Sequence, residues 1–175
     1  MKALALLAGA AAAAATLGVS YSIFSAGKEG APGFFGPGVL IADINLALEI
    51  LLVLGLTAGM ALARAGKIEA HRVNQTIWAL VNAALVASIM LGSMQDVKLA
   101  KAADLADARI GVTWLHAAVG AFTLVAGMWL VLQMNDVLPK ALHVAWWKNL
   151  MRATLAGYWA VALLGLATYY FWYAG

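Results

Sequence analysis

The sequence contains no cysteine, only three prolines and few charged residues. The absence of cysteine excludes disulfides, thiolate-bound iron–sulfur clusters and cysteine nucleophiles. Charged residues make up 11% and apolar residues 65% of the 175 positions, against about 25% and about 45–50% in soluble domains. The basic residues stand singly at the ends of apolar segments, which does not match a nucleic-acid-binding surface. The composition therefore indicates a membrane protein with no nucleic-acid partner.

Long apolar runs dominate the chain. A membrane-spanning helix needs about 20 mainly apolar residues, and five segments qualify: 3–25, 38–63, 73–94, 110–134 and 145–173. We expect an all-α integral membrane bundle of five transmembrane helices, forming a single membrane domain over residues 1–175. The first segment also matches a signal peptide with Lys2 at its charged start, but we interpret it as a retained span.

The distribution of Lys and Arg predicts how the chain is oriented, because cytoplasmic loops carry an excess of basic residues. One side of the predicted topology holds Lys2, Arg64, Lys67, Arg72, Lys140, Lys148 and Arg152. The other side holds Lys28, Lys98, Lys101 and Arg109, together with Glu29, Asp96, Asp104 and Asp107. We therefore expect a cytoplasmic N-terminus and a C-terminus outside.

Two charged residues fall inside predicted spans. Counted from the span ends, Glu49 lies about 18 Å below the outer edge and Arg152 about 10 Å from the inner edge. In an apolar core about 30 Å thick these depths nearly coincide, which predicts a buried Glu49–Arg152 charge pair. The alternative is that Arg152 extends to the interface, while Glu49 is protonated or faces a partner protein.

A second acid lies level with a histidine. The estimated depths of Asp43 and His116 are about 9 Å and about 10 Å from the outer edge. An Asp43–His116 contact would orient the imidazole and leave its other nitrogen free as a metal ligand. An ordinary hydrogen bond between helices explains the same pattern, as it does for Asn82. The small-residue spacing of Gly55 and Gly59 indicates helix packing.

The other two histidines, His71 and His143, fall at the cytoplasmic rim on different helix ends. Haem b between two helices needs two axial histidines at similar depth, and this pair meets that condition. Hydrogen bonds to loops or lipid headgroups are the alternative. Because His116 belongs to the opposite leaflet, the three histidines do not form one metal centre.

Short motifs resemble a known family. They are His71–Arg72 at the start of a span, Trp114–Leu115–His116 followed by Gly120, and Arg152, Thr154, Gly165 and Tyr169 in the last span. This pattern resembles a family of small multi-pass bacterial membrane proteins, formerly labelled a domain of unknown function, that includes a maturation factor for haem–copper cytochrome oxidase. The resemblance covers roughly the last three spans. The chain departs from the family pattern at Gln75, where the family has Met, and at Trp147, where it has His.

The resemblance implies the bacterial inner membrane, a respiratory context, and haem or copper as cofactor. We expect a small accessory or assembly subunit of an electron-transfer complex, non-catalytic rather than an enzyme, whose partners are other membrane subunits and the lipid bilayer. One alternative is a haem b-binding subunit that passes electrons to or from quinone. The other is a purely structural subunit of a large membrane complex.

Overall fold

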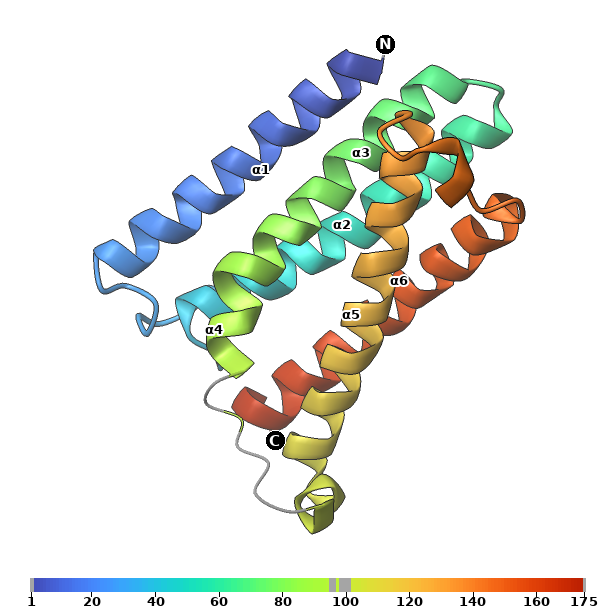
Figure 1. The fold of residues 1–175 in the computed structure, drawn as a ribbon. Helices are drawn as coiled ribbons and strands as arrows, with labels where there is room; N and C mark the ends of the chain where they lie inside the picture. The colour runs from blue at the N-terminus through green and yellow to red at the C-terminus, as the bar shows by residue number, and fades with distance from the viewer. Residues whose placement is uncertain (1, 95–96, 98–101, 175) are drawn as a thin grey trace.

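The computed structural model describes residues 2–94, 97 and 102–174, which fold into a bundle of helices (Figure 1). The elements are α1 (Lys2–Ser25), α2 (Leu40–Arg64), α3 (Ile68–Leu85), η1 (Val86–Met90), α4 (Leu91–Met94), η2 (Ala102–Ala106), α5 (Ala108–Met134), η3 (Lys140–Leu142), α6 (Trp147–Tyr169) and η4 (Tyr170–Ala174). Five helical stretches are long and apolar enough to cross a membrane. This confirms the predicted all-α membrane bundle, and the chain is a multi-pass membrane protein.

The boundaries differ most at the third span, where α3 begins at Ile68 rather than at residue 73. The turn after α2 is only three residues long, and Gly66 adopts a left-handed φ of 74° within it. Glu69 and Arg72 then form an ion pair of 3.1 Å across the first helical turn. Charged residues that predicted a loop are therefore compatible with helix, because residues three apart lie on the same helix face.

The core is formed by α2, α3, α5 and α6. Helix α3 contacts α1, α2 and α5, while α6 contacts α2 and α5. Helix α1 lies along the outside of α3 (Figure 1). It approaches closely because Gly9 faces the backbone of Thr76, and the Ser88 hydroxyl donates a hydrogen bond of 3.1 Å to Ser20.

The close approach of α2 and α3 confirms the packing role predicted for Gly55 and Gly59. A side chain at Gly55 would overlap the indole of Trp78. The backbone carbonyl of Gly55 accepts a hydrogen bond of 2.9 Å from the Asn74 amide. The Gln75 amide donates in the same way to the Leu56 carbonyl, at 3.0 Å. Small residues on α2 therefore let polar side chains of α3 bind its backbone.

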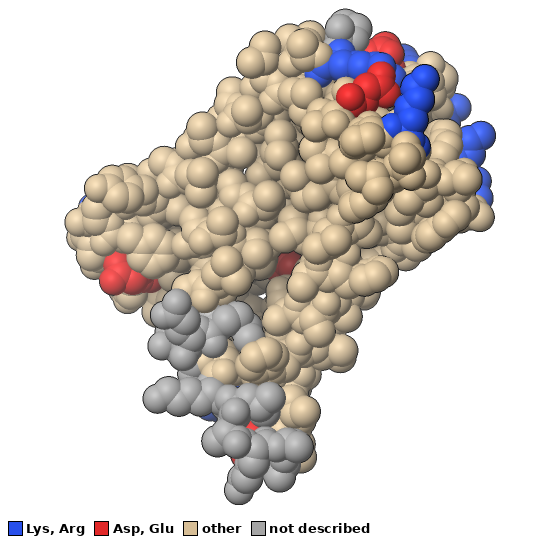
Figure 2. All heavy atoms as spheres, in the orientation of Figure 1, with Lys and Arg blue, Asp and Glu red and all other residues tan. Residues whose placement is uncertain are grey.

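Charge separates the two ends of the bundle. Figure 2 shows Lys and Arg gathered at one end, where the chain starts, α2 turns into α3 and α5 connects to α6. We call this the basic end; its residues are Lys2, Arg64, Lys67, Arg72, Lys140, Lys148 and Arg152. The opposite end, formed by the loop from residue 26 to 39 and the last turns of α6, is called the far end. The predicted grouping of these seven cations is confirmed.

Candidate functional site

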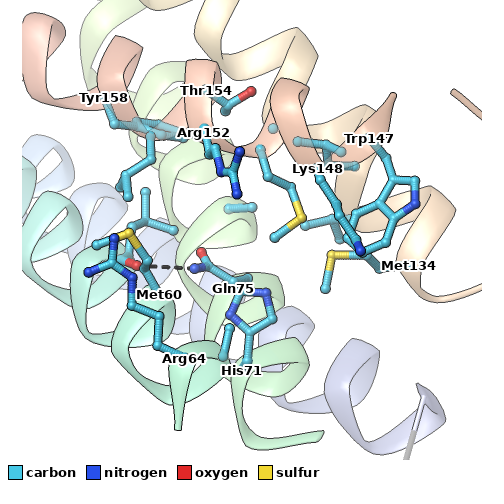
Figure 3. Close-up of a pocket in the computed structure, with 18 residues that line it drawn as sticks. Met60, Arg64, His71, Gln75, Met134, Trp147, Lys148, Arg152, Thr154 and Tyr158 are labelled. Atoms are coloured by element: carbon cyan, nitrogen blue, oxygen red, sulfur yellow. Dashed lines mark hydrogen bonds between the residues drawn. The ribbon is translucent and has the colours of Figure 1, made fainter. Parts of the chain in front are cut away.

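A cavity of about 470 Å³ opens at the basic end between α2, α3, α5 and α6 (Figure 3). Its walls combine apolar residues of all four helices with polar side chains of α2, α3 and α6. The polar and sulfur-bearing lining residues are Met60, Arg64, His71, Gln75, Met134, Trp147, Lys148, Met151, Arg152, Thr154 and Tyr158. Pockets for small molecules and cofactors have volumes of about 300–1,000 Å³ and mix apolar walls with a few polar groups. This cavity fits that description.

The imidazole of His71 is fixed in the wall of this cavity. Its Nδ1 lies 2.8 Å from the carbonyl oxygen of Gly59. A carbonyl only accepts hydrogen bonds, so Nδ1 carries the hydrogen and Nε2 of the neutral ring keeps its lone pair. Nε2 is buried without a hydrogen-bond partner among the described residues. The ring is thus oriented by one nitrogen and offers the other, as metal-binding histidines do.

Three cations surround the same cavity. Arg64 comes from the end of α2, while Lys148 and Arg152 come from the first turns of α6. Lys148 lies 5.4 Å from the centre of the Trp147 ring, a cation–π distance. No described residue that lines the cavity is acidic. The cavity therefore favours a ligand that carries negative charge beside an apolar body.

The predicted haem pair His71 and His143 is not brought together in this cavity. His143 follows η3 and precedes α6, and its Nε2 lies 3.1 Å from the carbonyl oxygen of Leu138. It lines a smaller adjoining cavity of about 200 Å³. Met134 and Trp147 line both cavities. The two histidines therefore lie at the same end of the bundle but line separate cavities.

The predicted Glu49–Arg152 pair is not formed. Glu49 lies instead beside His116 of α5, with 3.7 Å between Oε1 and Nε2. Both side chains are largely buried, with exposed fractions of 6% and 14%. Arg152 lies in the second turn of α6 at the basic end, is exposed, and makes a long contact of 3.5 Å with Asn149. A histidine, rather than an arginine, is the partner of the buried acid.

Asp43 does not contact His116 as predicted. Its carboxylate accepts a hydrogen bond of 2.5 Å from the Tyr169 hydroxyl and another of 2.5 Å from the backbone N–H of Phe35. Nδ1 of His116 lies 3.1 Å from the Val161 carbonyl oxygen instead. Asp43 therefore anchors the far-end loop to α6, and the expected Asp43–His116 metal site loses its acid. The described residues contain no group of three or more His, Cys, Asp or Glu that could hold a metal ion.

Sequence reasoning missed several residues of this arrangement. Arg64 and Lys148 were used only to orient the chain, although both line the cavity. Tyr158 is not among the predicted site residues, although its hydroxyl accepts a hydrogen bond of 3.3 Å from Asn82 and its side chain lines the cavity. The spacing of Lys148 and Arg152 could have indicated that they act together, because residues four apart on a helix share one face.

Comparison with known proteins gives no match. No family model, no curated protein and no solved structure is similar to this chain.

Proposed function

We propose that this protein is a non-catalytic accessory subunit of a membrane electron-transfer complex and that its basic-end cavity holds a haem. The observation that carries the proposal is the buried Nε2 of His71, which has no partner among the described residues while Nδ1 is fixed by the Gly59 carbonyl. Neutral imidazole in this state is the commonest iron ligand of haem proteins.

The remaining lining residues fit the other parts of a haem. Met60, Met134 and Met151 bring thioether sulfurs to the cavity, and a thioether is the usual partner of histidine in cytochromes of the c type. Arg64 and Arg152 would bind the two propionates through charge-assisted hydrogen bonds. When bound, the group would supply one-electron transfer, while the chain binds it, orients it and excludes water. The proposal does not require His143 as a ligand.

The visible spectrum of protein purified from haem-replete membranes tests this proposal. We expect a Soret band that His71→Ala abolishes and His143→Ala leaves in place. His143 is the matched control because it is a histidine at the same end that lines the adjoining cavity. A preparation without a Soret band, or a band that survives His71→Ala, contradicts the haem assignment. In that case an anionic lipid found by mass spectrometry would identify the ligand of the cationic cavity.

The proposed accessory role depends on the outer surface of the bundle, where partner subunits would bind. Many large apolar side chains are exposed on the isolated chain, among them Phe122, Val125, Leu163 and Leu166 on α5 and α6. Such surfaces contact either lipid or other membrane subunits. Extraction in a mild detergent followed by affinity purification should bring a redox complex with the tagged protein. Recovery of a monomer with no partner, in a preparation that retains its ligand, contradicts the accessory role.

A further inference from the structure

The pair formed by Glu49 and His116 is separate from the basic-end cavity and is not used by the proposed function. Nδ1 of His116 lies 3.1 Å from the carbonyl oxygen of Val161, so this nitrogen carries a hydrogen in either charge state of the ring. Nε2 faces Oε1 of Glu49 at 3.7 Å, and Oε1 has no hydrogen-bond partner among the described residues. The proton that this pair can gain or lose is therefore the one between Oε1 and Nε2.

With one proton held between them, the pair has no net charge. The proton either stays on the carboxyl group beside a neutral imidazole or moves to the imidazole beside a carboxylate. Loss of that proton leaves one negative charge, and gain of a second leaves one positive charge. An uncompensated charge is costly in an apolar membrane interior. The separation exceeds a direct hydrogen bond, so a bridging water or a small approach of the side chains completes the transfer.

Two polar side chains, Asn45 on α2 and Thr168 on α6, lie between the level of this pair and the far end, and we call this stretch of the two helices the seam. Asn45 lies one turn from Glu49 on the same face of α2, and Thr168 lies about one turn from Gly165 on α6. Gly165 is the residue against which the Glu49 carboxylate packs. Oδ1 of Asn45 and Oγ1 of Thr168 are both buried without a hydrogen-bond partner among the described residues. Buried polar atoms of this kind usually bind ordered water.

Farther toward the far end, Asp43 and Tyr169 are hydrogen-bonded to each other beneath the loop between α1 and α2. Asp43 is fully buried. The ring of Tyr173 of η4 is tilted by 46° against that of Tyr169, with ring centres 5.1 Å apart. Asp43, Tyr169 and Tyr173 are titratable groups toward the far end, and Tyr158 of α6 lies on the other side of the pair.

Toward the basic end the pair is covered by a cluster of buried, mainly apolar side chains. Leu52, Val53, Leu56, Tyr158 and Ala162 form a cluster in which every residue is buried. Leu56 and Tyr158 also line the basic-end cavity, so the cluster lies between that cavity and Glu49. Unpaired polar atoms therefore lie between Glu49 and one end of the bundle, and a buried, mainly apolar cluster lies toward the other.

We propose that Glu49 and His116 form a proton-binding site that exchanges with water at the far end through the α2–α6 seam. The proton comes from far-end water, is held between Oε1 and Nε2, and returns by the same route. The proposal is independent of the haem assignment, because no residue of the pair or of the seam lines the cavity.

Infrared titration of the full chain in lipid nanodiscs tests the site. We expect the carbonyl band of a protonated glutamic acid to interconvert with carboxylate bands as the pH changes, and Glu49→Gln to remove both. Glu69→Gln is the matched control, because Glu69 is a half-exposed acid at the basic end. His116→Asn keeps a donor for the Val161 carbonyl but removes Nε2, and should change the titration midpoint. If Glu49→Gln does not fold, this midpoint decides: an unchanged value overturns the proposal.

The route is tested by the rate of band interconversion after a pH jump. Asn45→Leu combined with Thr168→Val fills the seam with apolar atoms of similar volume, and we expect slower interconversion. Thr16→Val is the control, because Thr16 lies on α1, does not line the cavity and bonds locally to the Ala12 carbonyl; it should leave the rate unchanged. A seam-blocked variant that responds as fast as the unaltered protein overturns the route. Bands that are insensitive to pH, or that persist in Glu49→Gln, overturn the site itself.

Discussion

Gly165 of α6 and Glu49 of α2 are in direct contact, and a β-carbon at position 165 would overlap the carboxylate. The absence of a side chain on α6 is what lets the acid lie between α2 and α6, where it also meets His116. Gly120 of α5 lies in a looser place, because a β-carbon added there would have Cγ1 of Val161 as its nearest neighbour, at 4.0 Å.

Gly165→Ala should therefore displace Glu49 and destabilise the bundle. Overpacking of a tight interior costs about 1–3 kcal/mol, and the displaced carboxylate loses its buried setting as well. Gly120→Ala adds the same methyl group where there is room, and should change stability by less than about 0.5 kcal/mol. Thermal unfolding in detergent, followed by circular dichroism, measures both. Equal midpoints for the two variants contradict this account of Gly165.

A second prediction concerns Asp43, which holds the far-end loop. Asp43→Ala leaves the Phe35 N–H and the Tyr169 hydroxyl without their common acceptor, and each unsatisfied buried donor costs about 1–3 kcal/mol. Asp43→Asn keeps the shape and one acceptor oxygen, so its loss of stability should be smaller. Protease cleavage within residues 26–39 measures the release of the loop. Faster cleavage in the Asn variant than in the Ala variant would contradict this order.

A third prediction concerns the contact of α2 with α3 beside the cavity. A β-carbon at Gly59 would overlap the side-chain amides of Asn74 and Gln75, whose hydrogen bonds tie α3 to the α2 backbone. Gly59→Ala should lower the unfolding midpoint and weaken ligand retention, because the His71 hydrogen bond to the Gly59 carbonyl shifts with it. Gly18→Ala is the control, since a β-carbon at Gly18 meets nothing within 4 Å. Similar effects at both glycines would contradict this role.

The sequence predicted the elements well because their signal is strong. Five apolar runs of membrane length leave little freedom for the backbone, since every buried peptide group must bond within its helix. The grouping of the seven cations at one end followed from the same topology. Gly55 and Gly59 were also interpreted correctly, because close helix contact has a local small-residue pattern.

The side-chain pairs were predicted less well because a contact depends on the direction that each side chain faces as well as on its depth. Counting residues gives the height of Glu49 along α2, but neither the direction it faces nor the tilt of the other helices. Helix α5 crosses the bundle at an angle (Figure 1), so equal counts on α2 and α5 do not mean equal heights. His116 therefore meets Glu49, although counting placed it level with Asp43.

The last prediction separates the role of Arg152 from that of a buried ion-pair partner. Loss of a buried partner costs about 3–5 kcal/mol because an unpaired charge is left inside. Arg152 is exposed at the cavity, so Arg152→Gln should change the unfolding free energy by less than about 0.5 kcal/mol. It should nevertheless weaken haem binding and reduce its dependence on salt, because one propionate partner is lost.

Lys140→Gln removes an exposed cation at the same end that does not line the cavity, and should leave binding unchanged. Haem titration at low and high salt, paired with thermal unfolding, distinguishes the two roles. A large loss of stability in Arg152→Gln would instead indicate that Arg152 has a structural role.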